Sequence, residues 1–416
     1  MKLAVIGGGS TYTPEVIDGI VRLRDLMHVD DLYLQDTNPE RLKIVAGLAQ
    51  RMLERAGHPA RLYTTERLED AVEGADAVLI QIRVGGQAAR MVDESVPLAC
   101  GCLGQETTGF GGLAKALRTV PVVLDIAERA RRLSPDAWIV DFTNPVGIVT
   151  KALLDEGHKA VGLCSAAMVF QRHFAKVLEV VPERIELDHL GLNHLTWEVG
   201  VRLDGEDILP RLLLDERVAR ATGLPADLVA RLGTVPSYYL HYFYEHDAVV
   251  EEQRTGTSRA EIVSGIEQEL LHLYADEDLT EKPELLKQRG GAGYSEAAVE
   301  LIASLLGSAG EGRHVINLRN DGALPFLADD AVVEVPARIS GDGVEPVKLP
   351  QLGALERGLA AHVSAYEQLA LDAALRGGRE RVFRALLAHP LVGQAALADK
   401  LTDLMLEKNK GYLAWV

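Results

Sequence analysis

Residues Met1–Glu15 read MKLAVIGGGSTYTPE, and this stretch predicts how the fold begins. The apolar run Met1–Ile6 predicts a buried strand, and a turn of three glycines follows it at once. Thr13 is expected to cap a helix whose first position is Pro14. A strand, a glycine turn and a helix N-terminus together bind phosphate, because glycine lets the backbone approach the anion and free N–H groups face it. The stretch therefore predicts the pyrophosphate-binding turn of a dinucleotide site.

The turn departs from the G-x-G-x-x-G pattern at its third position. Gly7 and Gly9 fill the first two glycine positions, whereas Tyr12 stands at the third. The same residues would also form a plain strand-to-helix turn without a ligand. A second predicted strand, Leu32–Gln35, ends at Asp36. Asp36 is therefore the candidate acid for the adenosine ribose of a dinucleotide.

Strands and helices alternate through the first 165 residues. Further buried strands are predicted over 76–81, 138–142 and 160–163, with a helix over 114–132. This alternation predicts a Rossmann-type, doubly wound parallel sheet of the α/β class. Ligands bind beyond the carboxyl ends of such strands. We therefore expect one crevice to collect the residues that follow these strands: Gly7, Asp36, Arg83, Asn144 and Cys164.

The pattern changes after Cys164. Residues 1–165 are expected to form an NAD-binding Rossmann domain, and residues 166–416 a mixed α+β domain for catalysis, substrate binding and oligomerisation. Extended segments are expected over 185–203. The other expected elements are helices over 238–246, 261–274, 296–306 and the last sixty residues, and strands over 314–318 and 331–335.

Composition excludes several classes of protein. With 416 residues, 47% of them hydrophobic, the chain can bury a sizeable core and is not disordered. No run approaches the roughly 18 apolar residues of a membrane helix, and the net charge of −18 argues against nucleic-acid binding. Three cysteines are too few for a disulfide framework, so a cytoplasmic location is expected.

One cysteine and one histidine are candidate metal ligands. Cys164 and His194 each follow a predicted strand or lie in a turn, and a thiolate with an imidazole suits a borderline divalent metal. His189 lies close enough in sequence to be the partner instead. Spacing alone favours the simpler alternative, in which Cys164 is a small buried hydrophobe.

An aromatic segment is a candidate source of a general base. Residues 236–244 read PSYYLHYFY in a chain with only 5% aromatic residues. The segment could simply be a buried helix face, or one phenol could take a proton. A tyrosine has an ordinary pKa of about 10, so it needs a nearby cation to act as a base at neutral pH. Periodicity does not distinguish among the tyrosines.

Two glycine-rich polar segments are expected either to connect elements or to line a ligand site. They are Gln105–Gly112 and Gln288–Ser295. Arg83, Arg90 and Arg289 are candidate anion clamps, because a guanidinium fork matches phosphate oxygens. Any one of these arginines could equally be a solvated surface group.

Taken together, the motifs resemble glycoside hydrolase family 4, the NAD- and metal-dependent glycosidases, and are nearest in pattern to its 6-phospho-β-glucosidases. The shared motifs occur in the family's order along most of the chain. They are Ala4–Glu15, Gly104–Gly112, Phe142–Pro145, Gly162–Cys164, Gly191–Leu195 and Arg289–Gly291. An ordered set of this length is far more specific than any one motif.

The resemblance implies a reaction without the usual pair of carboxylates. In the family, NAD⁺ takes hydride from C3 of the sugar, a base removes the acidified C2 proton, and the aglycone leaves C1 by elimination. A divalent metal, most favourably Mn²⁺, stabilises the enediolate. Water then adds and NADH returns the hydride. The resemblance implies that the substrates are O-glycosides, with 6-phospho-β-glucosides as the expected form. It also implies a homodimer or homotetramer.

The resemblance also assigns roles to residues. Cys164 and His194 are expected to bind the metal, and Tyr239 to be the base, with Tyr238 as the alternative. The coenzyme contacts are expected from Gly7, Gly9, Ser10, Thr11, Asp36, Asn38, Arg83 and Asn144. The substrate contacts are expected from Arg90, Asn144, Ser165, Asn193 and Arg289.

Departures from the family pattern keep other functions open. Ser165 stands where the family usually has an asparagine after the metal cysteine, which bears on the identity of the sugar. A lactate/malate-type 2-hydroxy-acid dehydrogenase would share the fold, but it would need a histidine–aspartate pair and no metal. Asp188–His189 is adjacent in sequence, without the surrounding residues of such a dehydrogenase. An NAD-sensing protein without catalysis is a third alternative.

Overall fold

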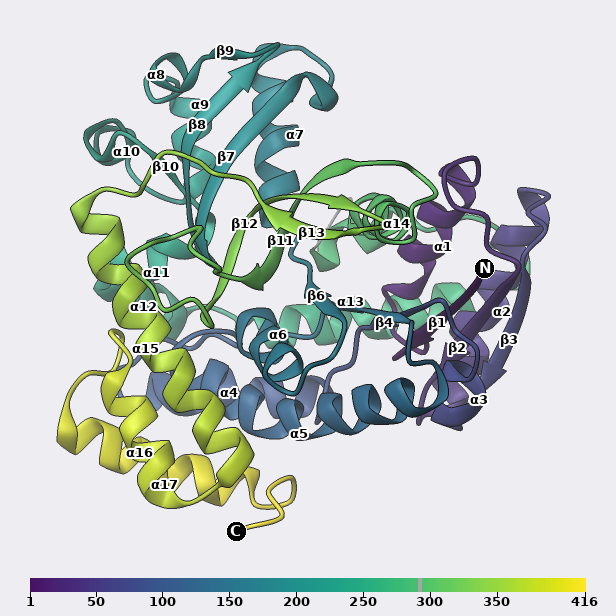
Figure 1. The fold of residues 1–416 in the computed structure, drawn as a ribbon. Coiled ribbons are helices and arrows are strands. Elements are labelled where there is room, and N and C mark those ends of the chain that lie inside the picture. The colour runs from purple at the N-terminus through teal and green to yellow at the C-terminus, as the bar shows by residue number, and fades with distance from the viewer. Residues whose placement is uncertain (291–293) are drawn as a thin grey trace.

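Short aliphatic runs form the parallel half of the sheet. The computed structural model describes residues 1–290 and 294–416, and its strands follow the order β3-β2-β1-β4-β5-β6 in this half, all parallel (Figure 1). This is the Rossmann order, as predicted. The strands are β1 (Lys2–Ile6), β2 (Asp31–Gln35), β3 (Arg61–Thr65), β4 (Ala77–Ile80), β5 (Trp138–Asp141) and β6 (Ala160–Gly162). The sequence did not predict β3, because its half-exposed residues RLYTT carry no apolar run.

The same sheet continues into the second half of the chain. Gly162 of β6 pairs with Asn317 of β11, and from there the strands are antiparallel in the order β11-β12-β7-β8-β10. The expected α+β character is therefore correct, and both halves share one sheet. The division at residue 165 stays a prediction. The added strands are β7 (Ile185–Leu192), β8 (Leu195–Leu203), β9 (Glu206–Asp207), β10 (Val235–Pro236), β11 (Gly312–Arg319), β12 (Val332–Ser340) and β13 (Gly343–Pro346).

Helices cover the sheet and extend beyond it. In the first half they are α1 (Thr13–Arg22), α2 (Pro39–Arg55), α3 (Leu68–Val72), α4 (Gly86–Ala99), α5 (Gly109–Leu133), α6 (Val146–Asp155) and α7 (Ala166–Leu178). In the second half the longer ones are α12 (His246–Thr255), α13 (Arg259–Tyr274), α14 (Tyr294–Leu305), α15 (Ala354–Arg376), α16 (Arg379–Ala388) and α17 (Ala395–Asn409). Helix α5 packs against α3, α6 and α15, whereas α14 packs against α1 and β11.

The remaining helices are short. They are η1 (Pro182–Arg184), α8 (Leu209–Leu212), α9 (Glu216–Thr222), α10 (Ala226–Leu232), η2 (Tyr238–Leu240), α11 (His241–Tyr244) and η3 (Glu284–Arg289). The continuous helix expected over 238–246 is therefore wrong, since the backbone leaves helical geometry at Glu245. Aromatic side chains lose rotamer freedom in a helix, which weakens helical propensity along this segment.

The start of α1 also differs from the prediction. Tyr12, not Thr13, occupies the N-cap position, and no side chain caps the helix. The hydroxyl of Thr13 instead donates to the carbonyl of Gly8 at 2.9 Å, inside the glycine turn. Thr13 therefore stabilises the turn itself, and Pro14 still lies in the first helical turn.

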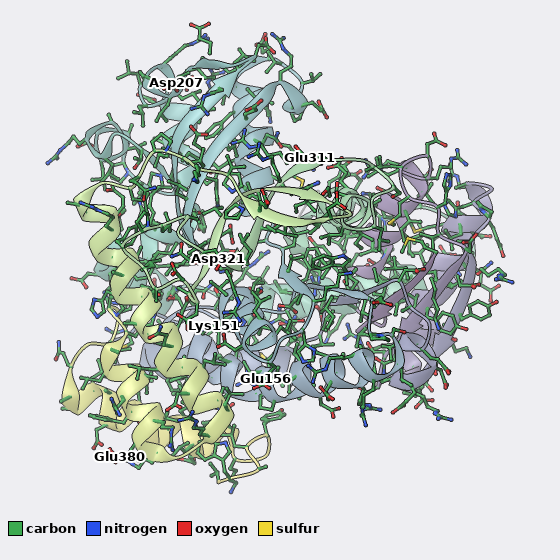
Figure 2. All side chains as sticks on the ribbon, viewed as in Figure 1. Lys151, Glu156, Asp207, Glu311, Asp321 and Glu380 are labelled. Carbon is green, nitrogen blue, oxygen red and sulfur yellow. The ribbon has the colours of Figure 1, made fainter. Side chains whose placement is uncertain are left out.

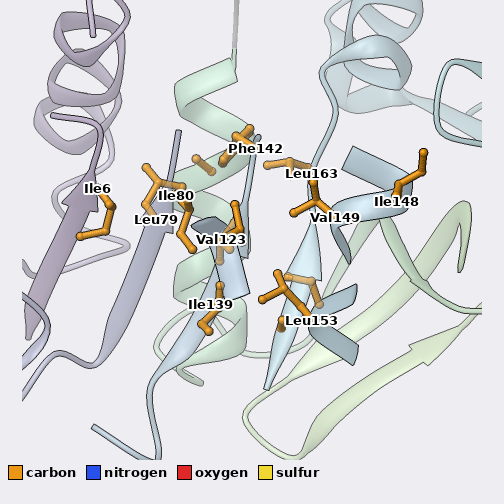
Figure 3. Packing of buried hydrophobic residues seen from close by; sticks show 14 of the residues in the cluster. Ile6, Leu79, Ile80, Val123, Ile139, Phe142, Ile148, Val149, Leu153 and Leu163 are labelled. Atoms are coloured by element: carbon orange, nitrogen blue, oxygen red, sulfur yellow. The ribbon is translucent and has the colours of Figure 1, made fainter. Parts of the chain in front are cut away.

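A layer of aliphatic side chains joins the parallel strands to the helices that cover them. Figure 3 shows Ile6, Leu79, Ile80, Ile139 and Val149 in this layer, and all are at most 3% exposed. Burying one such side chain contributes about 1.5–3 kcal/mol. Because the layer fixes where each strand ends, it also fixes the positions of the residues that follow the strands.

Many charged side chains lie at the periphery. Figure 2 shows Asp207, Glu311 and Glu380 there, and each is exposed. Among the described residues, we find no helix with the length and apolarity needed to cross a bilayer.

Candidate active site

A large cleft opens where the parallel strands end. Its volume is about 1650 Å³, more than the roughly 300–1,000 Å³ of a typical small-molecule pocket. The predicted convergence at the carboxyl ends of the strands is confirmed, because the cleft is lined by Gly7, Asp36, Arg83, Asn144 and Cys164. It has room for a dinucleotide and a second ligand together.

The glycine turn leaves no space for side chains. Gly7 has φ +89°, and a Cβ there would lie 2.8 Å from the carbonyl oxygen of Gln81. A Cβ on Gly9 would lie 2.8 Å from Oδ2 of Asp36. The N–H of Gly9 donates to the same oxygen at 2.9 Å, which ties the turn to the end of β2. This backbone cradle fits a pyrophosphate.

Tyr12, at the place of the third glycine, contacts a distant segment. Its hydroxyl donates to the carbonyl of Gly290, and the Arg289 guanidinium lies 4.7 Å from its ring centroid. Arg289 also donates to Glu267 at 2.8 Å. Thr11 is fully buried and is not among the described residues that line the cleft. Gly291, the last residue of the Arg289–Gly291 motif, lies outside the described residues.

The predicted ribose acid has backbone partners on both oxygens. Besides its contact with Gly9, Asp36 accepts through Oδ1 from the N–H of Asn38 at 2.9 Å. Asn38 in turn caps α2 by accepting from the N–H of Arg41 at 3.0 Å. Asp36, Asn38 and Ser10 all line the cleft.

A carboxylate within the cleft is surrounded by cations. Glu106 contacts Arg83, lies 2.8 Å from Nζ of Lys115 and 3.4 Å from a nitrogen of Arg90. Burial alone would raise the pKa of Glu106, but the positive charges of Arg83, Lys115 and Arg90 hold it well below its usual range. Burial, followed by the charge of Arg83, lowers the pKa of Lys115 to about 7. We call these four residues the Glu106 cluster.

The Glu106 cluster gathers three basic side chains around one carboxylate. Arg90 also pairs with Glu94 at 2.7 Å, and Lys115, with its pKa lowered to about 7, is only partly charged at pH 7. Sequence reasoning singled out Arg83 and Arg90 but missed Glu106 and Lys115. The signal available was a lysine within the apolar stretch of a long helix, since buried lysines are almost always paired.

The candidate metal ligands and the candidate base share one part of the cleft. The ring of His194 stacks on that of Tyr239, with centroids 3.7 Å apart and planes at 10°. Cys164 also lines the cleft. Burial, then the charges of neighbours that include Cys164, raises the pKa of Tyr239 well above its usual value. Burial lowers the pKa of His194 to about 4, so its imidazole is neutral at pH 7.

The alternative ligand His189 has no lone pair to offer a metal. Its Nδ1 lies 2.6 Å from Glu198 and its Nε2 lies 3.0 Å from Glu334, so both nitrogens face carboxylates. Burial would lower the pKa of His189, but the two carboxylates raise it to about 10. Glu334 also accepts from the amide of Asn193 at 2.7 Å. Asn193 is not among the described residues that line the cleft.

The other tyrosine of the pair has a different environment. Tyr238 is 50% exposed, and its ring lies against that of His241 with centroids 4.2 Å apart. Ser165, at the N-cap position of α7, lines the cleft beside Cys164. Tyr242, which sequence reasoning did not distinguish, lines it as well.

The residues present fit both expected ligands. A thiolate and a neutral imidazole form a donor set for a borderline divalent metal. Within residues 1–290 and 294–416, no group of three or more His, Cys, Asp or Glu side chains is placed to hold a metal. Asn144 lines the cleft, and its Oδ1 is buried without a hydrogen-bond partner among the described residues, which suits a polar ligand.

Comparison with known proteins identifies the family. A model described as Family 4 glycosyl hydrolase matches residues 2–180, and one described as Family 4 glycosyl hydrolase C-terminal domain matches residues 189–392. The "Probable 6-phospho-beta-glucosidase" of Bacillus subtilis is 38% identical over 436 residues, which cover 99% of this chain and 97% of that protein.

Solved structures agree with these matches. The 6-phospho-β-glucosidase of Thermotoga maritima with NAD and glucose-6-phosphate has a TM-score of 0.94 and 33% identity, covering 99% of each chain. The same enzyme was also solved with manganese, NAD⁺ and glucose-6-phosphate. Malate dehydrogenase of Plasmodium falciparum has a TM-score of 0.54 at 14% identity over 90% of this chain and 99% of that one. That likeness is one of fold alone. It shows a lactate/malate-type fold and does not support the dehydrogenase alternative. Relatives that match the chain from end to end therefore show that it belongs to family 4 of the glycosyl hydrolases.

Proposed function

We propose that this glycosidase hydrolyses 6-phospho-β-glucosides with NAD⁺ and a divalent metal, most favourably Mn²⁺. The observation that carries the proposal is the stacking of His194 on Tyr239 in the cleft that also contains the glycine turn. When bound, NAD⁺ supplies a hydride acceptor for C3 of the sugar, and the metal supplies a Lewis acid for its C2 and C3 oxygens. The net reaction adds water across the glycosidic bond and leaves no net oxidation.

The coenzyme is assigned to the end of the cleft near β1 and β2. The backbone of Gly7 and Gly9 would hold the pyrophosphate, with Ser10 and Thr11 in the same turn. Asp36 would accept from the adenosine ribose, and Asn38 fixes the backbone beside it. The coenzyme contacts further along the cleft are assigned to Arg83 and Asn144.

The chemistry is assigned to the end near β6. Sγ of Cys164 and a nitrogen of His194 would hold the metal, and Oη of Tyr239 would take the C2 proton. In the ligand-free protein, burial keeps the phenol protonated, because its pKa is raised. A cation held by the adjacent ligands favours the phenolate and offsets that effect. Tyr238, being half-exposed and stacked on His241, is less suited to this role.

Charge in the cleft supports an anionic substrate. The Glu106 cluster brings two guanidinium groups and Lys115, whose charged form an approaching anion would stabilise, to one part of the cleft, which favours a phosphate over a neutral group. We assign Arg90 and Arg289 to the phosphate, because guanidinium groups match its oxygens. Asn144 and Ser165 are assigned to the sugar hydroxyls, whereas Asn193, whose amide donates to Glu334, is left out of this assignment. The names of the B. subtilis and T. maritima relatives support a 6-phospho-β-glucoside.

A panel of nitrophenyl glycosides tests the proposal. The α and β anomers, each with and without a 6-phosphate, are assayed with NAD⁺, Mn²⁺ and a reductant. We expect the 6-phospho-β compound to be cleaved fastest, with NAD⁺ needed only in catalytic amount. Deuterium at C3 should pass to the coenzyme and back during turnover. Stoichiometric release of NADH without cleavage would overturn the proposal in favour of a dehydrogenase.

The cellular setting follows from the same chemistry. Cys164 is a free cysteine, and only a reduced thiol can bind the metal, so we assign the enzyme to the cytoplasm.

The family resemblance supports a homodimer or homotetramer, which light scattering of the purified protein tests.

A further inference from the structure

We propose that Gln105 and Thr107 fix the tautomer of His194, so that Nδ1 carries the proton and Nε2 presents the lone pair. Both would be positioning residues, acting through His194 without touching the substrate. The inference rests on the proposed metal role of His194. It adds to that role by explaining how a buried ring is kept ready to ligate.

The amide of Gln105 has a fixed orientation. Its side-chain oxygen accepts from the N–H groups of Thr107 and Thr108, the latter at 3.0 Å. An amide nitrogen in that position could not accept from two N–H donors. The group that faces Thr107 is therefore the carbonyl oxygen, which has no proton to give.

The direction of both hydrogen bonds of the Thr107 hydroxyl is therefore fixed. Its Oγ1 lies 2.8 Å from the Gln105 oxygen and 2.9 Å from Nδ1 of His194. Its single proton must point to the Gln105 oxygen, because that oxygen can only accept. Towards His194 the hydroxyl offers a lone pair, so Nδ1 is the donor. In a neutral imidazole the other nitrogen, Nε2, is then unprotonated.

The segment that carries this chain of hydrogen bonds is held at both ends. A Cβ on Gly112 would lie 2.7 Å from the carbonyl of Thr107, so the first turn of α5 packs directly against it. From the other side, Nε2 of His389 accepts from the N–H of Gly109 at 3.0 Å. The backbone around Thr107 is thus held by contacts that do not involve His194.

The ring of His194 is also restrained on its face. Tyr239 stacks on it, and the backbone of His194 adopts φ +61°, a left-handed conformation that non-glycine residues rarely adopt. The hydroxyl of Thr107 contacts the ring edge. Tyr239 on the ring face and Thr107 at the ring edge together restrain the orientation of the imidazole. Metal-binding histidines are commonly oriented by such neighbouring groups.

Mn²⁺ binding to the purified protein, followed by the electron paramagnetic resonance signal of free Mn²⁺, tests the inference. Thr107→Val keeps the shape of the side chain but removes the hydroxyl, and should weaken Mn²⁺ binding about 10- to 100-fold. Thr107→Ser restores the hydroxyl and should restore affinity. Thr108→Val removes a neighbouring hydroxyl that faces His389 instead, and should bind Mn²⁺ as wild type does.

The outcomes separate this inference from the function it rests on. If wild type binds no Mn²⁺, the proposed metal site itself is wrong. If wild type binds Mn²⁺ and Thr107→Val binds it equally well, or Thr107→Ser binds as weakly as Thr107→Val, the tautomer inference alone is wrong.

A second measurement needs no change at Thr107. In metal-free wild type with ¹⁵N-labelled histidine, the ring signals of His194 are identified by their absence in His194→Gln. We expect the pattern of a neutral ring protonated at Nδ1. A ring protonated at Nε2 would overturn the inference even if Thr107→Val did not fold.

Discussion

The imidazole of His194 lies face to face with the phenol of Tyr239, 3.7 Å between centroids. These two residues come from different elements, the turn between β7 and β8 and the short helix η2. The stacking brings a candidate metal ligand against a candidate base. A cation on His194 would therefore act on the phenol at short range, where its effect on acidity is greatest.

Replacement of Cys164 by alanine tests the metal site. Cys164→Ala should abolish Mn²⁺ binding and metal-dependent turnover, because one of two protein donors is lost. NAD⁺ affinity should be unchanged. Calorimetric titration with each ligand measures both, and Cys100→Ala serves as the matched control. Turnover at the wild-type rate in Cys164→Ala would show that the ligand lies elsewhere.

Replacement of Tyr239 by phenylalanine tests the base. Tyr239→Phe should slow exchange of the C2 proton with solvent by about 10²–10⁴-fold, the usual contribution of a general base. The ring remains, so stacking on His194 is preserved. Exchange into D₂O, read by proton NMR, gives the rate. Tyr238→Phe is the control and should exchange normally; the reverse result would move the base to Tyr238.

A methyl group in the glycine turn tests the coenzyme site. Gly9→Ala places a Cβ 2.8 Å from Asp36, so the turn must shift and NAD⁺ should bind more weakly. Quenching of protein fluorescence by the coenzyme measures the affinity. Gly47→Ala, on α2, meets only the flexible end of Arg51 and should bind NAD⁺ normally. Equal affinity in both variants would place the coenzyme away from this turn.

Stability should depend on pH through His189. Its pKa is about 10 in the folded protein against an ordinary 6.5, because Glu198 and Glu334 favour the charged ring over the opposing effect of burial. A raised pKa stabilises the fold fully below pH 6.5, and this contribution is lost as pH rises towards 10. The free energy of unfolding, from urea titrations of the metal-free protein, should fall across that range.

Removal of the His189 ring should destabilise the folded protein. His189→Ala leaves two buried carboxylates without their cation and should destabilise the protein by about 3–5 kcal/mol at pH 7. It should also flatten the decline between pH 6.5 and 10. His272→Ala removes an exposed histidine and should leave both the stability and its pH dependence unchanged. An unchanged pH profile in His189→Ala would mean that another group titrates.

Local sequence determined the elements whose signals are local. The strands that became β1, β2, β4, β5 and β6 were predicted because each is a short aliphatic run ended by a glycine or polar residue. Once parallel strands are known, the edge at which their carboxyl ends meet is fixed, so the cleft could be placed in advance. The half-exposed β3 carried no such signal and was missed.

Only the tertiary structure decided which chemistry each residue can perform. His189 and His194 are alike in sequence, but Glu334, 145 residues beyond His189, occupies one nitrogen of His189. Tyr238 and Tyr239 are neighbours, and only Tyr239 meets His194. A lone pair, a charge or a phenol is made available or unavailable by whatever packs against it, and those partners come from remote parts of the chain. Local patterns therefore specify where a site forms, whereas long-range contacts specify what its groups can do.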